Sequence, residues 1–549
     1  MRSRPRRVTF SMFSSLRTRV SSRGGHPDTW VIAVTGGTLV AFVAAALAAP
    51  EAVSSAIDTA FGWSAAWFGA YWQLLLVATF AVMTVLALSR YGRVRMGGDV
   101  APAFTWFRWV AMILTTLLAA GGVFWAASEP IAHYVDAPPQ YADSAGGMEG
   151  AALAMAQSFT HWGFGAWAIG GSLATLVMMR GVEKGLPLRP RTLLWPLMGE
   201  RVRTHWVGTL ADIACVLAVV AGTVGPIGFL GLQVSYIAGE AFGLPNGYAT
   251  QAVVIIGLAL VATVSVLTGL TRGIELLSRI NIYGAIAMVL AIVALASAPF
   301  VVDLYLQAGA VHLRELAPMM LFRGDAAWLG SWTVFFAGWF IGYGPLMAIF
   351  IARISRGRTV RQIYVGATLL PTVVSSVWFT ALGGSGLWLE IQNPGTVSDA
   401  YAQDGLPATA LAIVQALPMS AVMAVLMVVV TLVFFASTMD TMSYSISLSS
   451  VHSGEPSLLV RAFWCMGMGV AAAVLLLIGD GGVEALQSFI VVSAVPVGLV
   501  LLPSVWGAPR LVRQMAVEQG VVNQPAPKPT AQVADQGGLE SVSVGAGKD

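Results

Sequence analysis

Long apolar runs, each about as long as a helix needs to cross a bilayer, dominate the hydropathy pattern of this chain. A hydrocarbon core about 30 Å thick takes a helix of about 20 residues. The runs predict twelve membrane-spanning helices over residues 29–49, 66–89, 104–128, 153–179, 207–232, 250–270, 280–302, 331–351, 364–388, 417–440, 459–479 and 484–508. An even number of spans places both termini on one side of the membrane.

Basic residues between the runs fall in alternate loops. The basic segments are Arg2 to Arg23, residues 90–95, Arg180 to Arg203, Arg272 with Arg279, and Arg353 to Arg361. The opposite loops carry the acids Glu51, Asp58, Glu129, Asp136, Asp143, Glu149, Glu240, Asp399 and Asp404. Because Lys and Arg are retained on the cytoplasmic side, we expect a multi-pass protein of the cell (inner) membrane with both termini cytoplasmic.

The composition excludes a soluble domain. The chain is 57% hydrophobic and only 10% charged, with a mean hydropathy of +0.76, whereas soluble domains are about one-quarter charged. Its 59 Gly and 26 Pro predict closely packed helices, some of them interrupted. Cys215 and Cys465 both fall in apolar runs, which favours packed thiols over a metal site or a disulfide.

Three segments differ from the spans. Residues 1–28, rich in Arg and Ser, predict a basic cytoplasmic arm, with a transit peptide as the alternative. Residues 29–510 form one twelve-helix domain, and the polar residues 511–549 predict a disordered cytoplasmic tail. Residues 303–322 are too polar to span and predict a helix lying along the outer surface of the bundle.

Glycine and proline clusters in three runs predict interrupted helices. They are AAGG (119–122), AGTVGPIG (221–228) and GYGP (342–345). Backbone carbonyls freed at such breaks bind cations or substrates. Glycine equally predicts close helix packing, so both interpretations stand.

Aromatic residues gather in HWGFGAW (161–167) and WTVFFAGWFIGY (332–343). Stacked rings can hold a cation by their negative faces. For any single Trp, however, lipid contact or core packing is the commoner role.

Polar side chains gather in ASTMDTMSYSIS (436–447). Ser437, Thr438 and Asp440 are costly if they face lipid, so we expect them to face the interior. Their oxygens suit sodium, and hydrogen bonds to the preceding helical turn are the alternative.

Isolated titratable groups carry less information. Glu129 and Asp212 lie at predicted span ends, where solvation or pairing with a loop arginine accounts for each, with a proton relay as the alternative. His161 predicts a buried neutral imidazole with one hydrogen-bond partner. The sequence has no HExxH, paired acidic motif or nucleophile flanked by a base, so we do not expect an enzyme.

The segment WTVFFAGWFIGYGPLMAIFIARISRGRT (332–359) resembles the signature of the betaine/carnitine/choline transporter (BCCT) family. The resemblance extends over about residues 28–510, through SRYGRVRMG (89–97), FWAASEP (124–130), HWGFGAWAI (161–169), TGLTRGIELLSRIN (268–281) and residues 463–487. It implies an all-α membrane protein of twelve transmembrane helices, with two inverted five-helix repeats (about 104–302 and 331–508, a LeuT-like fold) after two N-terminal helices. It also implies alternating access and a homotrimer in membrane lipid.

The family's aromatic box for substrate ammonium groups lies on spans 4 and 8. The substrate-binding residues that the resemblance implies are Trp162, Trp167, Gly170, Trp339, Phe340 and Tyr343. Gly170 stands where a tyrosine is usual, and Phe340 and Ala337 stand where tryptophans are usual. Since Trp is the best cation–π partner, this thinner box favours a bulkier or less cationic solute than a compact trimethylammonium compound.

The family's sodium site implies hydroxyls on span 10 and carbonyls on span 3. The matching positions are Ser437, Thr438, Thr115 and Leu118. The run TTLLAAGG (115–122) lacks the usual glycines and resembles the sodium-independent carnitine antiporter more closely. Met347 matches a methionine that stands in for an ion there, whereas Asn281 occupies the place of its arginine. Met347, Asn281 and Asp440 are thus candidate coupling residues.

The resemblance predicts a secondary active transporter that imports a small zwitterionic or quaternary-ammonium-type solute. We expect sodium as the coupling ion, no other cofactor and no nucleic-acid partner. The alternatives are a sodium-independent exchanger of the same fold and a non-transporting solute sensor. The scarcity of basic residues in the tail favours metabolite uptake over osmosensing.

Overall fold

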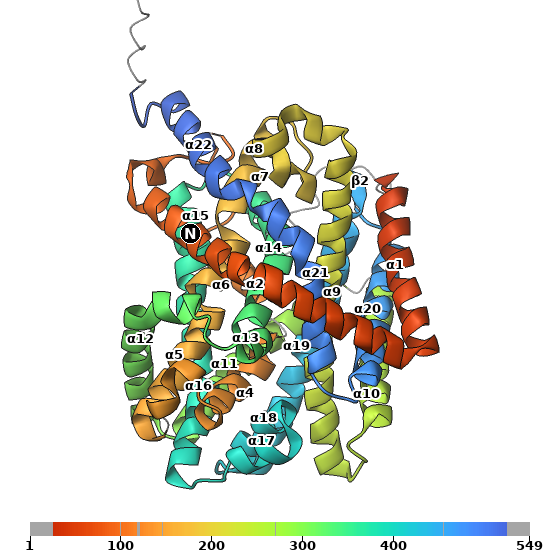
Figure 1. The fold of residues 1–549 in the computed structure, drawn as a ribbon, viewed down its shortest axis with the longest axis vertical. Coiled ribbons are helices and arrows are strands. Elements are labelled where there is room, and N and C mark those ends of the chain that lie inside the picture. The colour runs from red at the N-terminus through yellow and green to blue at the C-terminus, as the bar shows by residue number, and fades with distance from the viewer. Residues whose placement is uncertain are drawn as a thin grey trace, which may run out of the picture.

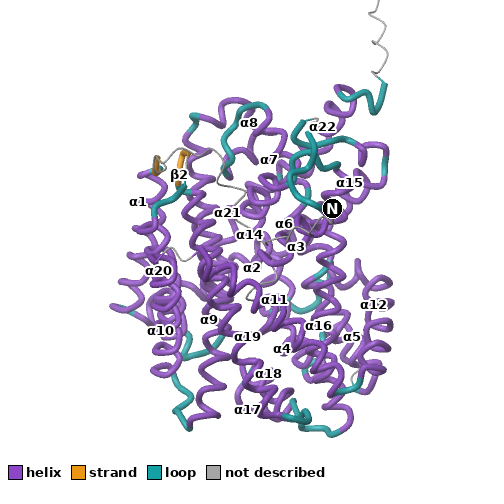
Figure 2. The backbone as a smooth tube through the Cα atoms, turned by 180° about the vertical axis from the view of Figure 1, so that it is seen from behind, coloured by secondary structure: helices purple, strands orange, loops and turns teal. Residues whose placement is uncertain are grey.

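The computed structural model describes residues 26–98, 100–117, 121–144, 146–268, 271–453 and 455–523. This part of the chain is helical except for its loops and one antiparallel pair of short strands, β1 (His26–Pro27) and β2 (Val451–Ser453). Figure 2 shows the strands at one end of the helical bundle.

The helices run along the whole described chain (Figure 1). Up to residue 295 they are α1 (Thr29–Ala48), α2 (Pro50–Leu88), α3 (Trp106–Leu117), α4 (Gly121–Val135), α5 (Gly147–Trp162), α6 (Phe164–Gly171), α7 (Leu173–Glu183), α8 (Trp195–Met198), α9 (Trp206–Phe242), α10 (Tyr248–Thr268) and α11 (Thr271–Leu295). They continue with α12 (Ala298–Leu321), α13 (Ala326–Ser331), α14 (Thr333–Ile354), α15 (Val360–Tyr364), α16 (Leu370–Gln392), α17 (Ser398–Asp404), α18 (Leu406–Gln415), α19 (Ser420–Ser449), α20 (Leu458–Ile478), α21 (Glu484–Leu501) and α22 (Pro503–Glu518). Shorter turns are η2 (Arg90–Arg93), η3 (Pro139–Ser144), η4 (Pro190–Leu194), η5 (Gly199–Arg203) and the π turn η6 (Val365–Leu369).

Ten helical stretches of the described chain, some of which join consecutive helices such as α5 to α7, are long and apolar enough to cross a membrane, or eleven if one bent pair counts as a span. The bent pair is Tyr283–Leu295 with α12, at 105° to each other. The predicted span 104–128 contains α3 and the first part of α4, and residues 118–120 between them lie outside the described residues. The all-α, multi-pass class is confirmed, while twelve spans and inverted repeats stay predictions.

The predicted breaks at 221–228 and 342–345 are wrong, because α9 and α14 run through them as continuous helices. The glycines there serve close packing instead. A Cβ at Gly225 would lie 2.4 Å from Ile490 of α21, and one at Gly344 would lie 2.7 Å from Leu501. Neighbouring helices stabilise a membrane helix that contains Pro and Gly. Of the third predicted break, 119–122, residues 119 and 120 lie outside the described residues, and Gly121 and Gly122 begin α4.

Loops that were predicted to be cytoplasmic share one end of the molecule. Arg189 pairs with Asp28 at 2.8 Å, and Arg180 of α7 contacts Glu518 of α22 at 2.6 Å. In Figure 1, α7, α8, α22 and β2 lie at the top, whereas α17 and α18 lie at the bottom. Charge placement therefore identified the loops that meet in space.

The polar segment 303–322 lies within α12, which packs against α5. Leu304, Ala308 and Met319 are buried on one face of α12, and Leu306 and Leu313 are exposed on the other. This two-faced burial matches the expected helix resting on the bundle.

Candidate substrate and ion site

The fourth predicted span is broken at two points, and the breaks place its tryptophans. Gly163 (φ −102°, ψ −134°) separates α5 from α6, and Ser172 (φ −121°, ψ −98°) separates α6 from α7. A Cβ at Gly163 would lie 2.3 Å from the carbonyl oxygen of Phe159, so only glycine fits. Trp162 thus ends α5, while Trp167 lies in α6.

Trp162 is the centre of a ring cluster built from α5, α14 and α16. Phe340 meets it edge-on, with ring centroids 5.4 Å apart and planes at 90°. Trp339 lies 5.7 Å and Phe379 5.2 Å from it, centroid to centroid. All four residues are buried. The structure thus brings the predicted residues Trp162, Trp339 and Phe340 together and adds Phe379, which has no distinguishing signal in an apolar run.

Trp339 and Tyr343 also face α9. The Trp339 Nε1 donates to the carbonyl oxygen of Gly222 at 3.0 Å, and the Tyr343 hydroxyl lies 3.3 Å from Thr223 Oγ1. A Cβ at Gly222 would lie 3.2 Å from the Tyr343 ring. The missing side chain at Gly222 therefore lets α14 approach α9 beside the ring cluster.

Trp167 and Gly170 lie apart from the ring cluster. Trp167 Nε1 donates to Ser375 Oγ at 2.9 Å, and within the described ranges no ring contact joins Trp167 to another aromatic side chain. A Cβ at Gly170 would lie 3.7 Å from Cβ and Cγ of Met347, which is fully buried. Met347 therefore lies beside the position where the family has a tyrosine.

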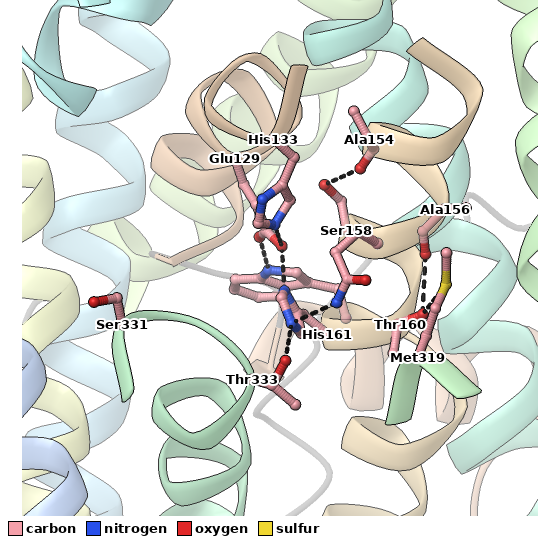
Figure 3. A network of polar contacts seen from close by, with 12 residues as sticks. Glu129, His133, Ala154, Ala156, Ser158, Thr160, His161, Met319, Ser331 and Thr333 are labelled. Atoms are coloured by element: carbon pink, nitrogen blue, oxygen red, sulfur yellow. Dashed lines mark hydrogen bonds and ion pairs between the residues drawn. The ribbon is translucent and has the colours of Figure 1, made fainter. Parts of the chain in front are cut away.

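A buried carboxylate, Glu129, adjoins the ring cluster, and Figure 3 shows it with His133, His161 and Thr333. Glu129 of α4 is 0% exposed, and its Oε2 accepts a hydrogen bond from Trp162 Nε1 at 2.8 Å. Its Oε1 lies 2.6 Å from His161 Nδ1. The other ring nitrogen of His161 lies 3.0 Å from both Gln157 Nε2 and Thr333 Oγ1. Solvation or loop-arginine pairing of Glu129 is therefore wrong, because α4 continues beyond it and carries it inside.

His133 completes this group one turn further along α4. Its Nε2 lies 3.4 Å from Glu129 Oε1, and its ring centroid lies 4.3 Å from that of Trp332. Neither ring nitrogen has a hydrogen-bond partner among the described residues. The sequence does not reveal this group, because His161 is 32 residues away from Glu129 and only the fold brings the two side chains together.

The candidate sodium ligands are partly visible on α19. Ser437 Oγ donates to the carbonyl oxygen of Phe434 at 3.0 Å. Thr438 is 2% exposed, and its Oγ1 has no hydrogen-bond partner in the described part of the chain. A buried hydroxyl without a partner is disfavoured, so Thr438 can serve as an ion ligand. The side chains of Thr115 and Asn281, and all of Leu118, lie outside the described residues.

Asp440 and Asp212 are both paired. Asp440 Oδ1 accepts from an Arg461 guanidinium nitrogen at 2.6 Å, and that guanidinium lies over the Tyr444 ring. Asp212 is fully buried, with Oδ2 2.7 Å from Arg191 Nε. The structure therefore confirms that Asp212 pairs with a loop arginine, as the sequence suggested.

A small cavity lies between η4, α9, α14 and α19. It is lined by Pro190, Cys215, Val216, Val219, Pro345, Leu346, Ile349, Ile446 and Ser449. Leu346 and Val219 lie one helical turn from Tyr343 and Thr223, respectively. The cavity therefore lies between the α9–α14 contact beside the ring cluster and the end where the basic loops meet.

The family model for the BCCT, betaine/carnitine/choline family transporter, matches residues 30–517. Glycine betaine transporter 2 of Vibrio parahaemolyticus serotype O3:K6 (strain RIMD 2210633) is 46% identical over 498 residues, which are 90% of this chain and 92% of that protein. Glycine betaine transporter 1 of the same strain is 31% identical over 494 residues, 86% of this chain and 91% of that protein.

Among solved structures, the substrate-bound outward-open state of a Na+-coupled sialic acid symporter is similar to this chain with a TM-score of 0.40 and 12% identity. The similarity covers 81% of this chain and 98% of that chain.

Proposed function

This chain belongs to the betaine/carnitine/choline transporter family, and from that membership we propose that it is a secondary active transporter importing a small zwitterionic or quaternary-ammonium solute by alternating access. The expectation that it is not an enzyme is confirmed by the family. The relatives named above are glycine betaine transporters, which supports a betaine-like solute here.

One observation supports the substrate class most directly: the buried cluster of Trp162, Trp339 and Phe340. Ring faces attract a desolvated cation by about 2 kcal/mol. The three rings come from α5 and α14, so a solute bound against them would contact two different helices. We assign the ammonium end of the solute to this cluster.

The shape of the site supports a solute larger than a compact trimethylammonium compound. Gly170 leaves its position without a side chain, and only Met347 is within 4 Å of a Cβ built there. Phe340 also has a smaller ring than the usual tryptophan, and Ala337 has no ring. The retained Trp167 of α6 and Tyr343 of α14 complete the proposed substrate site.

For coupling we propose sodium. Thr438 supplies a buried hydroxyl without a partner among the described residues, and Ser437 is its neighbour. Thr115 and Leu118 are the proposed ligands from the third span. Exchange without sodium is the second candidate. The buried Met347 beside Gly170 favours it, because Met347 matches a methionine that stands in for an ion in the sodium-independent carnitine antiporter.

We further propose the family's architecture and setting for this chain. It comprises twelve spans with inverted repeats, a homotrimer, and an orientation in the cell (inner) membrane with the basic end cytoplasmic. The small cavity near Pro190 then lies on the cytoplasmic side of the substrate site.

Uptake into proteoliposomes tests the proposal. Glycine betaine, choline, carnitine and bulkier betaines are first ranked by thermal stabilisation of the purified protein. Radiolabelled uptake of the best solute is then measured with and without an inward sodium gradient. Gradient-dependent uptake supports symport, whereas sodium-independent uptake that preloaded solute accelerates replaces it with exchange. Binding without any transport would indicate a sensor.

A further inference from the structure

Glu129, His133 and His161 form a buried group that is not among the substrate or sodium ligands proposed above. We propose that it binds one proton when the substrate site closes and releases it when the site opens, so that a proton travels with the solute. This inference rests on the proposed transport function and adds a proton site to it.

The first argument is charge balance. Glu129 is 0% exposed, and its ion-pair contacts within the described ranges are only the imidazoles of His161 and His133. An isolated buried carboxylate is strongly disfavoured, and the indole of Trp162 brings no charge. One proton shared between Glu129 and His161 makes the group neutral. Their 2.6 Å separation suits such a charge-assisted hydrogen bond.

The second argument is the unpartnered imidazole of His133. It is 2% exposed, and its Nε2 points at Glu129 Oε1 from 3.4 Å without a hydrogen bond. Buried polar atoms without partners are rare. A small rotation converts this contact into a hydrogen bond, so His133 can receive or deliver the proton.

The position of His133 indicates the side of the membrane from which the proton enters. Along α4, Glu129 is followed by His133 and then by the exposed Asp136, which accepts a hydrogen bond from Tyr401. Asp136 lies in one of the acidic loops, away from the basic end. The proton therefore enters from the side that we propose to be extracellular.

Neighbouring elements do not supply a competing charge. Their titratable and charged groups are Asp303, Tyr305, His312, Arg314 and Glu315 on α12, Tyr343 and Arg353 on α14, Glu390 on α16, Asp399, Tyr401 and Asp404 on α17, Asp212, Tyr236 and Glu240 on α9, Asp325 beside α13, Tyr141 and Asp143 in η3, and Tyr134 and Glu149 on α4 and α5. In the described part of the chain, none of these lies within hydrogen-bond or ion-pair distance of Glu129, His133 or His161. α6 and α18 have no such group in their sequences.

Two contacts link the proton to the solute. Glu129 holds Trp162, the centre of the ring cluster, and His161 contacts Thr333 at the start of α14, the helix that carries Trp339 and Phe340. Opening of the ring cluster separates α5 from α14 and admits water to the group. Water then solvates the carboxylate, so that burial no longer disfavours its charged form, and the proton passes to water. Closure around the solute removes this water, and the group binds a proton again. Because coupling between two ligands is reciprocal, proton binding must in turn favour solute binding.

The proton balance is simple. A proton from water on one side joins the Glu129–His161 pair, and the same proton leaves to water on the other side. No bond between heavy atoms changes, and nothing is oxidised or reduced.

Calorimetry of solute binding tests this proposal at constant sodium concentration. Titrating glycine betaine in two buffers of different ionisation enthalpy, between about pH 6 and pH 8.5, gives the number of protons taken up per solute. The wild type is expected to take up about one proton and to bind more tightly as the pH falls. Glu129→Gln is expected to bind with nearly zero proton uptake, and His133→Phe, which breaks no hydrogen bond, is expected to reduce the uptake.

His312→Gln is the matched control, because His312 is also a buried imidazole but contacts Thr160 instead of Glu129. It should keep the wild-type proton uptake. Solute binding without proton uptake in the wild type, or unchanged uptake in Glu129→Gln, would overturn the proton site while leaving the transport proposal intact.

A second measurement needs no solute. Infrared difference spectra of the purified protein over the same pH range should show one protonation signal that Glu129→Gln removes; its absence from the wild type contradicts the proposal even if glycine betaine does not bind. Stoichiometric Zn2+ retained by the wild type and lost in Glu129→Gln would make the group a metal site and also refute the proposal.

Discussion

The indole nitrogen of Trp162 lies 2.8 Å from Glu129 Oε2, so the central ring of the aromatic cluster on α5 is held by a buried carboxylate on α4. Trp162→Phe keeps a ring but removes this donor. We expect solute affinity to fall about tenfold, or about 1.4 kcal/mol, because Phe is the weaker cation–π partner and the carboxylate loses a hydrogen bond. Calorimetric or fluorescence titration measures the change.

Trp378→Phe of α16 is the control for that substitution. It also removes one indole hydrogen bond, here to the carbonyl oxygen of Gly122, but Trp378 is not part of the proposed substrate site. Affinity is expected to change by less than about threefold, or about 0.7 kcal/mol. Equal losses in both variants would mean that the solute is not centred on Trp162.

Two adjacent glycines in α6 should respond differently to alanine. A Cβ at Gly170 meets Met347 at an ordinary 3.7 Å, whereas a Cβ at Gly171 would lie 2.7 Å from the backbone oxygen of Ala367. We expect Gly170→Ala to shift the melting temperature by less than about 2 °C and Gly171→Ala to lower it by about 5 °C or more. Thermal denaturation of the detergent-solubilised protein compares them, and similar melting temperatures would contradict the close approach of α6 to η6.

The fold was predictable at the level of spans because apolar length and loop charge report directly on lipid contact and membrane side. The positions at which the helices are interrupted could not be predicted in the same way. Gly163 lies at the break between α5 and α6, where a side chain would strike the Phe159 carbonyl, whereas Gly225 lies within α9, where the missing side chain leaves room for Ile490. The residue type is the same, and the difference lies in a neighbour that the sequence does not reveal.

The site was predictable where a family motif covers it and hidden where it depends on contacts between distant segments. Trp162, Trp339 and Phe340 were found through the resemblance and do lie together. Glu129 was misplaced because hydropathy ends the third span near residue 128, although α4 continues to Val135. The polar partner that allows the carboxylate to be buried, His161, comes from another helix.

Buried and exposed ion pairs near the basic end should differ in importance. Asp212→Asn leaves Arg191 and Arg189 facing a neutral side chain at a fully buried position, which typically destabilises by about 3 kcal/mol or more. Glu200→Gln breaks an exposed pair with Arg203 and should have little effect. Yield and melting temperature after purification distinguish them; a normally stable Asp212→Asn protein would show that this pair does not hold the loop to α9.

The hydroxyl of Thr438 tests sodium coupling most directly, because it is buried without a partner among the described residues. Thr438→Val keeps the shape and replaces the unpaired hydroxyl by a methyl group, so folding should be unaffected. If the hydroxyl binds sodium, the sodium concentration for half-maximal uptake should rise about tenfold, the equivalent of about 1.4 kcal/mol. Ser445→Ala is the control, since Ser445 lies on the same helix but bonds to the Thr441 carbonyl. Wild-type sodium dependence in Thr438→Val, with normal uptake, would place the sodium site elsewhere.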